Sequence, residues 1–166
     1  MKIISLIALG LACALSGRYI AVRLSRRVKI LEKIILMFGT IETEIGYLSR
    51  PTEELIKRLA DKDELAELDF LPACLSLCES GESINEAWCN ALSGSDKITG
   101  DDSCILYSFG ENLGRSDVDG QLANCRYHSE LAQERLREAR EKRERYASLA
   151  CGLGMLSGIG IFIIFF

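Results

Sequence analysis

The chain has 166 residues, of which 27% are charged and 48% are apolar, and it contains only 2 prolines. This composition excludes a collagen-like or disordered chain, and the length suits one ordinary domain. The formal net charge of −4 gives no sign of a nucleic-acid-binding protein.

Charge is distributed unevenly along the chain. Residues 18–33 hold six basic residues and one acidic residue, and residues 134–145 hold six basic and four acidic residues. The middle of the chain, residues 42–130, holds seven basic and nineteen acidic residues. An acidic body is therefore flanked by two basic segments.

Apolar segments lie outside both basic segments. Residues 147–166 carry no charge, and a helix of this length is about 30 Å long, so a C-terminal transmembrane helix is predicted. Residues 3–17 form a shorter apolar run of about 23 Å. Lys2 and Arg18 can extend this run by reaching toward the headgroups. We therefore expect an N-terminal transmembrane anchor at residues 1–22 and a C-terminal transmembrane helix at residues 147–166.

The orientation follows from the basic residues that come after the first apolar run. The positive-inside rule places residues 23–146 in the cytoplasm as a helical bundle, with both ends of the chain outside. A cleaved signal peptide is an alternative, because Ala12-Cys13-Ala14 resembles a cleavage site. Lipid attachment at Cys13 is a weaker alternative, because Gly10 stands where such a site has leucine.

Helical periodicity dominates the body. Apolar residues at steps of three and four predict one long helix over residues 24–48, which Ser49-Arg50-Pro51 ends. Short helices are expected after Pro51, after a partly helical connector at residues 61–67, and on both sides of a loop at residues 93–100. A last helix is expected to run from Val118 to Phe166. The predicted fold class is all-α: an antiparallel helical bundle of about six helices flanked by N- and C-terminal transmembrane helices.

Capping residues mark the ends of these helices. Ser83 and Glu86 form a capping box, and Gly81 and Gly114 are typical of helix C-termini. The remaining N-termini are expected at Asp69, at Thr99 with Asp102, and at Ser116 with Asp119.

Candidate ligands and catalytic groups are few. Cys74 and Cys78 are four residues apart and could begin a metal site, but no second Cys or His pair has a suitable spacing. The chain has seven cysteines, an odd count, and its body is expected in the cytoplasm. Buried, reduced thiols are therefore favoured, and no metal and no cofactor is expected. His128 is expected on the surface of the last helix. The chain lacks a P-loop and a nucleophile with a histidine at a recognisable spacing, so a non-enzymatic protein is expected.

Three motifs, in this order and spacing, carry a family resemblance. They are Glu44-Ile45-Gly46-Tyr47 followed by Pro51, Ser83-Ile84-Asn85-Glu86-Ala87-Trp88, and Leu113-Gly114-Arg115-Ser116-Asp117 followed by Gln121. With the two flanking apolar segments, they make nearly the whole chain resemble the stage III sporulation protein AB family of endospore-forming bacteria. That family is related to the cytoplasmic domains of the type II secretion F protein. Thr52 departs slightly from the pattern, in which an apolar residue follows the proline.

The resemblance implies a membrane platform or scaffold subunit of the channel or secretion-like complex that links the mother cell and the forespore. It implies a cell-membrane protein in the mother-cell membrane around the forespore. Its implied partners are a secretion-type ATPase of the same operon, resembling stage III sporulation protein AA, and other membrane proteins of the complex. A membrane-tethered helical signalling adaptor or sensor is the alternative function.

Several residues are candidates for contacts with partners. Arg115, Asp117 and Gln121 could form an interaction surface, although capping alone explains the composition of their turn. Trp88 is either an interface residue or, more simply, a core anchor. Gly154 and Gly158 offer a small-residue face that could pack against another membrane helix, including the first one through Gly10 and Ala14.

Overall fold

In the computed structural model, the backbone is described for residues 2–48, 52–98 and 100–165, and the side chains for residues 18–46, 54–98 and 100–149. The described backbone forms six α-helices and one short 3-10 helix, and it contains no strand. The elements are α1 (Lys2–Leu48), α2 (Thr52–Ala60), η1 (Asp63–Leu65), α3 (Phe70–Glu79), α4 (Ile84–Ser93), α5 (Asp101–Asn112) and α6 (Val118–Phe165). The all-α prediction is confirmed, as are the long first and last helices.

The chain divides into two compact units. One, which we call the terminal unit, comprises Met1–Val28 and Arg137–Phe166, the outer parts of α1 and α6. The other, the globular unit, comprises Lys29–Leu136 and contains the four short helices together with the inner parts of α1 and α6. Each unit is described separately below.

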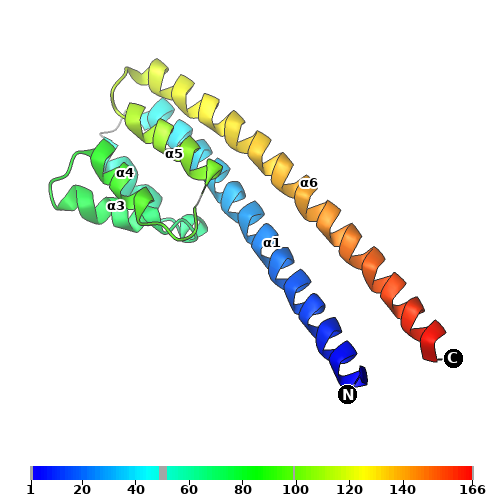
Figure 1. Ribbon diagram of the computed structural model, residues 1–166. Helices are drawn as coiled ribbons and strands as arrows, with labels where there is room; N and C mark the ends of the chain where they lie inside the picture. Colours follow the sequence, from blue (N-terminus) through cyan, green and yellow to red (C-terminus); the bar gives the residue numbers. More distant parts are fainter. Residues whose placement is uncertain (1, 49–51, 99, 166) are drawn as a thin grey trace. The chain divides into compact units, whose positions relative to one another are not determined.

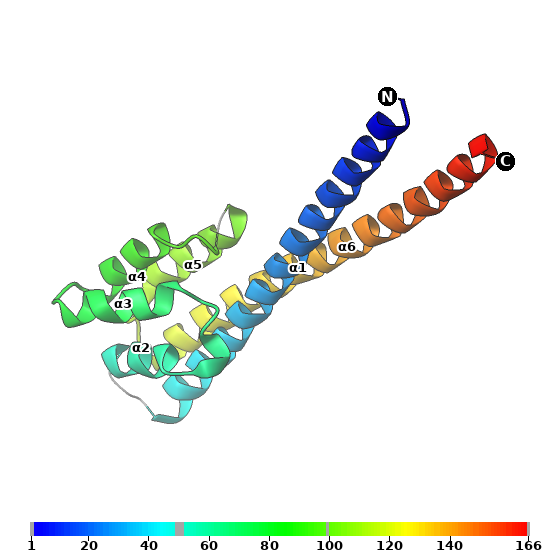
Figure 2. The same cartoon turned by 90° about the horizontal axis from the view of Figure 1, so that it is seen from below.

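The short helices of the globular unit pack in chain order. Helix α3 lies beside α2 on one side and beside α4 on the other, and α4 also packs on α5 (Figures 1 and 2). Each helix contributes one apolar face because its apolar residues recur at helical spacing. The residues that fill this part of the core are Leu55, Ile56, Leu59, Leu65, Leu68, Phe70, Leu71, Ala87, Trp88, Leu92, Leu106 and Phe109.

Within the globular unit, α1 and α6 run antiparallel. The Cys125 thiol of α6 donates a hydrogen bond to the Phe38 carbonyl of α1 at 3.1 Å. Leu122 lies one turn before Cys125 on α6, and Gly46 lies two turns after Phe38 on α1. These two residues face each other, because a Cβ built on Gly46 would be 3.8 Å from the Leu122 side chain. Residue numbers thus rise along one helix as they fall along the other, which confirms the antiparallel arrangement for this pair.

Aromatic rings connect the short helices to α1 and α6. Phe70 of α3 contacts Trp88 of α4 with ring centroids 4.9 Å apart, and Trp88 lies 5.6 Å from Phe109 of α5. Phe109 in turn contacts Phe38 of α1 at 4.9 Å and His128 of α6 at 5.7 Å. These edge-to-face and tilted pairs form a single chain of rings through five helices of the globular unit.

Local sequence explains several helix boundaries as expected. The Ser83 hydroxyl accepts a hydrogen bond from the Glu86 backbone N–H, which confirms Ser83 as the N-cap of α4, and the same hydroxyl donates to the Glu86 carboxylate at 2.8 Å. Gly81 has φ of +96°, and the N–H groups of Gly81 and Glu82 bond to the carbonyls of Cys78 and Leu77. This is the Schellman pattern that ends α3, and it requires a backbone conformation that glycine adopts without strain.

Three predicted N-caps differ in the structure. Asp69 makes no side-chain cap, because its carboxylate instead accepts a hydrogen bond from the Ser95 hydroxyl at 2.6 Å. Helix α5 begins after Gly100, which makes no side-chain cap, and Thr99 lies outside the described residues. At the start of α6, Asp117 rather than Ser116 accepts the hydrogen bond from the Gly120 N–H, at 3.1 Å.

The prediction for His128 was wrong, because this side chain is only 3% exposed and lies in the core. Its ring packs on Phe109 and, at 6.4 Å, on Phe38. The Nδ1 atom lies 2.8 Å from the Asn124 carbonyl oxygen. A carbonyl oxygen can only accept a hydrogen bond, so Nδ1 carries the hydrogen. Nε2 is buried and has no hydrogen-bond partner among the described residues.

A search of the described residues for a helix apolar and long enough to cross a membrane finds none. The apolar runs of the two expected membrane segments, residues 3–17 and most of residues 147–166, lie outside the residues with described side chains. Gly154 and Gly158 also lie outside them.

Candidate interaction site at the α5–α6 junction

The C-terminal end of α5 is tied to α4 by one amide side chain. Asn85, in the first turn of α4, donates from Nδ2 to the carbonyls of Gly110 and Leu113, the latter at 2.9 Å. The last carbonyls of a helix have no partner within the helix. The Gly110 carbonyl also accepts from the Leu113 N–H, and the Asn85 amide adds a donor to it and to the Leu113 carbonyl. These bonds fix α4 against the end of α5.

Gln121 closes the turn that follows. Its Oε1 accepts a hydrogen bond from the Gly114 N–H at 3.1 Å, and its Nε2 donates to the Asn112 carbonyl at 2.9 Å and to the Ser116 hydroxyl at 2.8 Å. The side chain is only 6% exposed. Because donor and acceptor atoms of one buried amide are both used, the turn between α5 and α6 is held in a single arrangement.

Trp88 anchors the same region from the core. It is completely buried, and its indole N–H donates to the Leu106 carbonyl of α5 at 2.9 Å. The ring lies directly on Gly110, where an added Cβ would be 2.7 Å from Nε1 and 2.8 Å from Cγ. Trp88 therefore packs α4 on α5 and presents no surface to a partner.

The end of α1 belongs to the same end of the globular unit. Gly46 faces Leu122, and Glu44 forms an ion pair with Arg58 of α2 at 3.6 Å. The other carboxylate oxygen of Glu44 is buried and accepts no hydrogen bond from a described residue. Tyr47 and Pro51, which belong to the first motif, lie outside the residues with described side chains.

The three sequence motifs thus meet at one end of the globular unit. Asn85, Trp88 and Gln121 are the buried or half-buried members that hold the helices together, whereas Arg115 and Asp117 are exposed in the turn. Val118 beside them is 43% exposed. The turn from Gly114 to Val118 is therefore a rigidly held surface, and only its exposed members are available to a partner.

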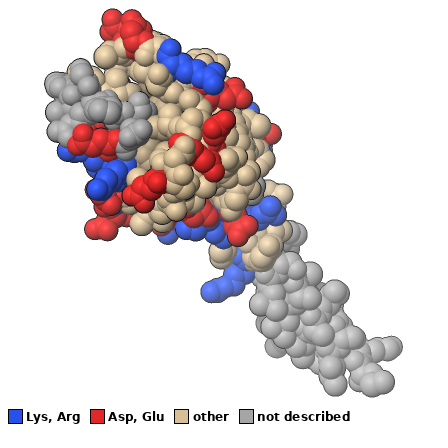
Figure 3. Space-filling model, turned by 90° about the vertical axis from the view of Figure 1, so that its left-hand side faces the viewer, with Lys and Arg blue, Asp and Glu red and all other residues tan. Residues whose placement is uncertain are grey.

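The helices that precede this turn, α3, α4 and α5, are acidic. Helices α3, α4 and α5 contain no lysine or arginine, and Arg115 is the only basic residue between Lys97 and Arg126. On the face shown in Figure 3, acidic side chains are spread among uncharged ones, and basic side chains are visible around the edge. The globular unit as a whole carries ten basic and twenty-one acidic residues. Such a surface attracts a partner of positive charge and repels one of negative charge.

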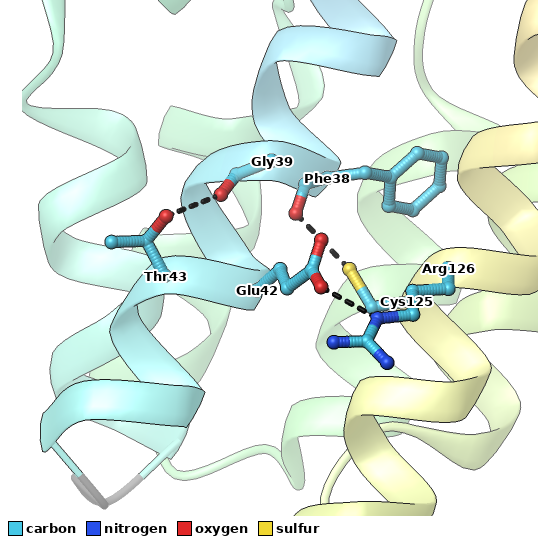
Figure 4. A network of polar contacts seen from close by, with 6 residues as sticks. All are labelled: Phe38, Gly39, Glu42, Thr43, Cys125 and Arg126. Carbon is cyan, nitrogen blue, oxygen red and sulfur yellow. Dashed lines mark hydrogen bonds and ion pairs between the residues drawn. The ribbon is translucent and has the colours of Figure 1, made fainter.

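A polar contact between α1 and α6 lies close to the junction (Figure 4). The Arg126 guanidinium bonds to the Glu42 carboxylate at 2.6 Å on the exposed side of the helix pair, and this contact raises the pKa of Arg126. Beside it, the buried Cys125 thiol donates to the Phe38 carbonyl. Burial raises the pKa of Cys125 to about 12, so the thiol stays protonated and remains a donor.

The other cysteines have varied surroundings. None of the five cysteines with described side chains forms a disulfide: Cys74 and Cys125 are buried, Cys78 and Cys89 are half-buried, and Cys104 is exposed. The expectation of buried thiols is therefore wrong for Cys104. Burial, followed by the neighbouring Cys78, raises the pKa of Cys74 to about 12. Among the residues with described side chains, no group of three or more His, Cys, Asp or Glu residues could hold a metal ion.

Sequence reasoning missed the residues that complete the site. The contacts of Asn85 and Gln121 depend on which helix ends meet, and Asn85 lies 25 residues before its partner Gly110. The burial of His128 does not follow from apolar periodicity, because histidine is polar. Its spacing of three residues from Cys125 and four from Ala132, both buried, was the signal that could have found it.

The described residues define an all-helical protein whose three sequence motifs gather at one helix junction. The chain belongs to the stage III sporulation protein AB family, whose family model matches residues 2–166. Searches of curated proteins and of solved structures returned no match. Membership of this family implies a role in sporulation.

Proposed function

We propose that this protein is a non-enzymatic platform subunit of the sporulation complex between mother cell and forespore. Its ends lie in the mother-cell membrane around the forespore, and its globular unit docks a cytoplasmic secretion-type ATPase of the kind encoded in the same operon. The family membership supports the sporulation role. The docking role is our extension of it.

The observation that carries the docking proposal is the base-free surface of α3, α4 and α5. These helices present exposed carboxylates such as Glu79, Asp101 and Glu111, without a single lysine or arginine to neutralise them. Complementary charge accelerates association and excludes partners of the same sign. A basic surface on the ATPase is the expected counterpart, and the rigid α5–α6 turn places Arg115 and Asp117 at the edge of this acidic surface.

The test is a binding measurement between the full chain in nonionic detergent and the purified ATPase. The double variant Glu79→Lys, Glu111→Lys changes the charge of the acidic surface, and the control Glu130→Lys, Glu134→Lys makes the same change in charge on the exposed side of α6. We expect the first variant to weaken binding at least tenfold and the second to change it less than twofold. Equal effects of both variants, or no binding by a folded wild-type chain, would reject the docking role.

The candidate contacts in the turn are tested separately. Arg115→Ala removes an exposed cation, and Asp117→Asn removes a charge but keeps an oxygen that can accept the bond from the Gly120 N–H. Loss of ATPase binding in either variant, at unchanged stability, assigns that side chain to the interface. Unchanged binding in both variants restricts the interface to the helical surface.

A further inference from the structure

The terminal unit has the opposite charge to the globular unit. It contains ten basic residues and three acidic residues, so its formal charge is +7, whereas the globular unit carries −11. The whole-chain value of −4 hides this division. No acidic residue occurs in the α1 part of the terminal unit, and the three that occur in the α6 part are Glu138, Glu141 and Glu144.

The positive charge is presented to the surroundings. Arg18, Arg23 and Arg26 are exposed on α1, and Arg137, Lys142 and Arg145 are exposed on α6. We call these six residues the basic collar. Because water reaches every one of them, all six can meet an anionic surface.

Exposed aromatic and aliphatic side chains accompany the basic collar. Tyr19 follows Arg18 directly and is 70% exposed, and Tyr146 follows Arg145 directly and is 50% exposed. Val22 and Leu149 are more than 60% exposed. Tyrosine prefers the boundary between headgroups and hydrocarbon, since its ring is apolar and its hydroxyl is polar. Exposed aliphatic groups beside arginine fit lipid better than nucleic acid, whose edges and backbone are polar.

We propose that the basic collar, with Tyr19 and Tyr146, binds the phosphate headgroups of anionic phospholipids. Arginine presents paired N–H donors that match two phosphate oxygens. Each basic side chain close to an anionic membrane surface strengthens binding about fivefold. This inference rests on the proposed location of the chain ends in a membrane, and it adds a preference for the headgroup that membrane spanning alone does not require.

The experiment measures lipid preference on the full chain. The protein in nonionic detergent is mixed with equal amounts of phosphatidylcholine and phosphatidylglycerol, and native mass spectrometry counts the bound lipids of each kind. We expect phosphatidylglycerol to predominate at least fivefold on the wild-type chain. The variant Arg18→Gln, Arg23→Gln should lose this preference. The control Arg115→Gln, Arg126→Gln removes two arginines from the globular unit and should retain it.

Three results would overturn the inference. They are equal binding of both lipids to the wild-type chain, equal effects of the two double variants, and tighter binding of a 20-base oligonucleotide than of phosphatidylglycerol at the collar. Flotation with pure phosphatidylcholine vesicles tests the membrane location independently. If the chain floats but shows no headgroup preference, the membrane location stands and the lipid site is rejected. If the chain does not float, the membrane location is rejected.

Discussion

The Trp88 ring occupies the space in which a side chain at position 110 would lie, so the packing of α4 on α5 requires glycine there. Gly110→Ala should force the ring away and reduce the free energy of unfolding by about 1–3 kcal/mol. Chemical denaturation followed by the fluorescence of Trp88, the only tryptophan, measures this change.

The matched control is Gly39→Ala in α1. A Cβ at Gly39 meets no atom within 4 Å, so the substitution should leave stability unchanged or raise it by up to about 1 kcal/mol through helix propensity. Equal destabilisation by the two alanines would contradict the account of Gly110.

Asn85 should contribute to stability through the end of α5. In Asn85→Ala, the Leu113 carbonyl loses the Asn85 donor and the Gly110 carbonyl keeps only the Leu113 N–H, so we expect a loss of about 1–3 kcal/mol in the free energy of unfolding. The side chain of Asn90, on the same helix, is exposed and bonds only to the Glu82 carboxylate among the described contacts, so Asn90→Ala should cost less than about 0.5 kcal/mol. If Asn85→Ala costs as little as Asn90→Ala, water replaces the Asn85 amide at the two carbonyls and the prediction is wrong.

Gln121→Glu gives a pH-dependent prediction. At neutral pH the new carboxylate would face the Asn112 carbonyl without a hydrogen to donate, so the variant should lose about 1–3 kcal/mol. Burial raises the pKa of this introduced carboxyl above its unfolded value, so the folded state binds the proton more tightly. The deficit should therefore shrink as the pH falls toward 4 and grow as the pH rises.

Unfolding curves at several pH values test this, with Gln133→Glu as the control. Gln133 is exposed on α6, so its replacement should show neither the deficit nor its recovery in acid. A Gln121→Glu deficit that does not vary with pH would show that shape, rather than the missing donor, is responsible.

Buried thiols should make the protein sensitive to alkali. The pKa of Cys125 is raised from 9.0 to about 12 in the folded state because the thiolate would be buried. Above pH 9 the unfolded chain releases this proton and the folded chain does not, so stability falls as the pH rises from 9 toward 12. The slope attributable to one such thiol is about 1.4 kcal/mol per pH unit.

Cys125→Ala should remove that contribution to the slope between pH 9 and pH 10.5, whatever its effect on stability at neutral pH. The control is Cys104→Ala, which removes a thiol that is exposed rather than buried. If the two variants have the same alkaline slope, burial of Cys125 does not govern the alkaline response.

Local chemistry made much of the fold predictable. The N-cap at Ser83 and the glycine that ends α3 depend on residues within a few positions of each other, and both predictions are confirmed. Asp69 shows the limit of such reasoning. A carboxylate before a helix is a good cap in isolation, but Ser95, 26 residues later, binds it instead.

The candidate site was harder to predict for the same reason. Arg115, Asp117 and Gln121 were recognised as neighbours in sequence, but nothing in their spacing indicated that Gln121 is buried while the other two are exposed. Asn85 belonged to a recognised motif without an assigned role. Its role depends on the distance between two helix ends, which periodicity does not encode.

The order of packing in the globular unit has a consequence for how the chain folds. Helices α2 to α5 each contact the next in sequence, so their contacts close short loops and form early. The contact between Cys125 and Phe38 closes a loop of 87 residues, whose ordering cost is larger. During synthesis, the four short helices can assemble while α6 is still in the ribosome, and the pairing of α6 with α1 then completes the globular unit.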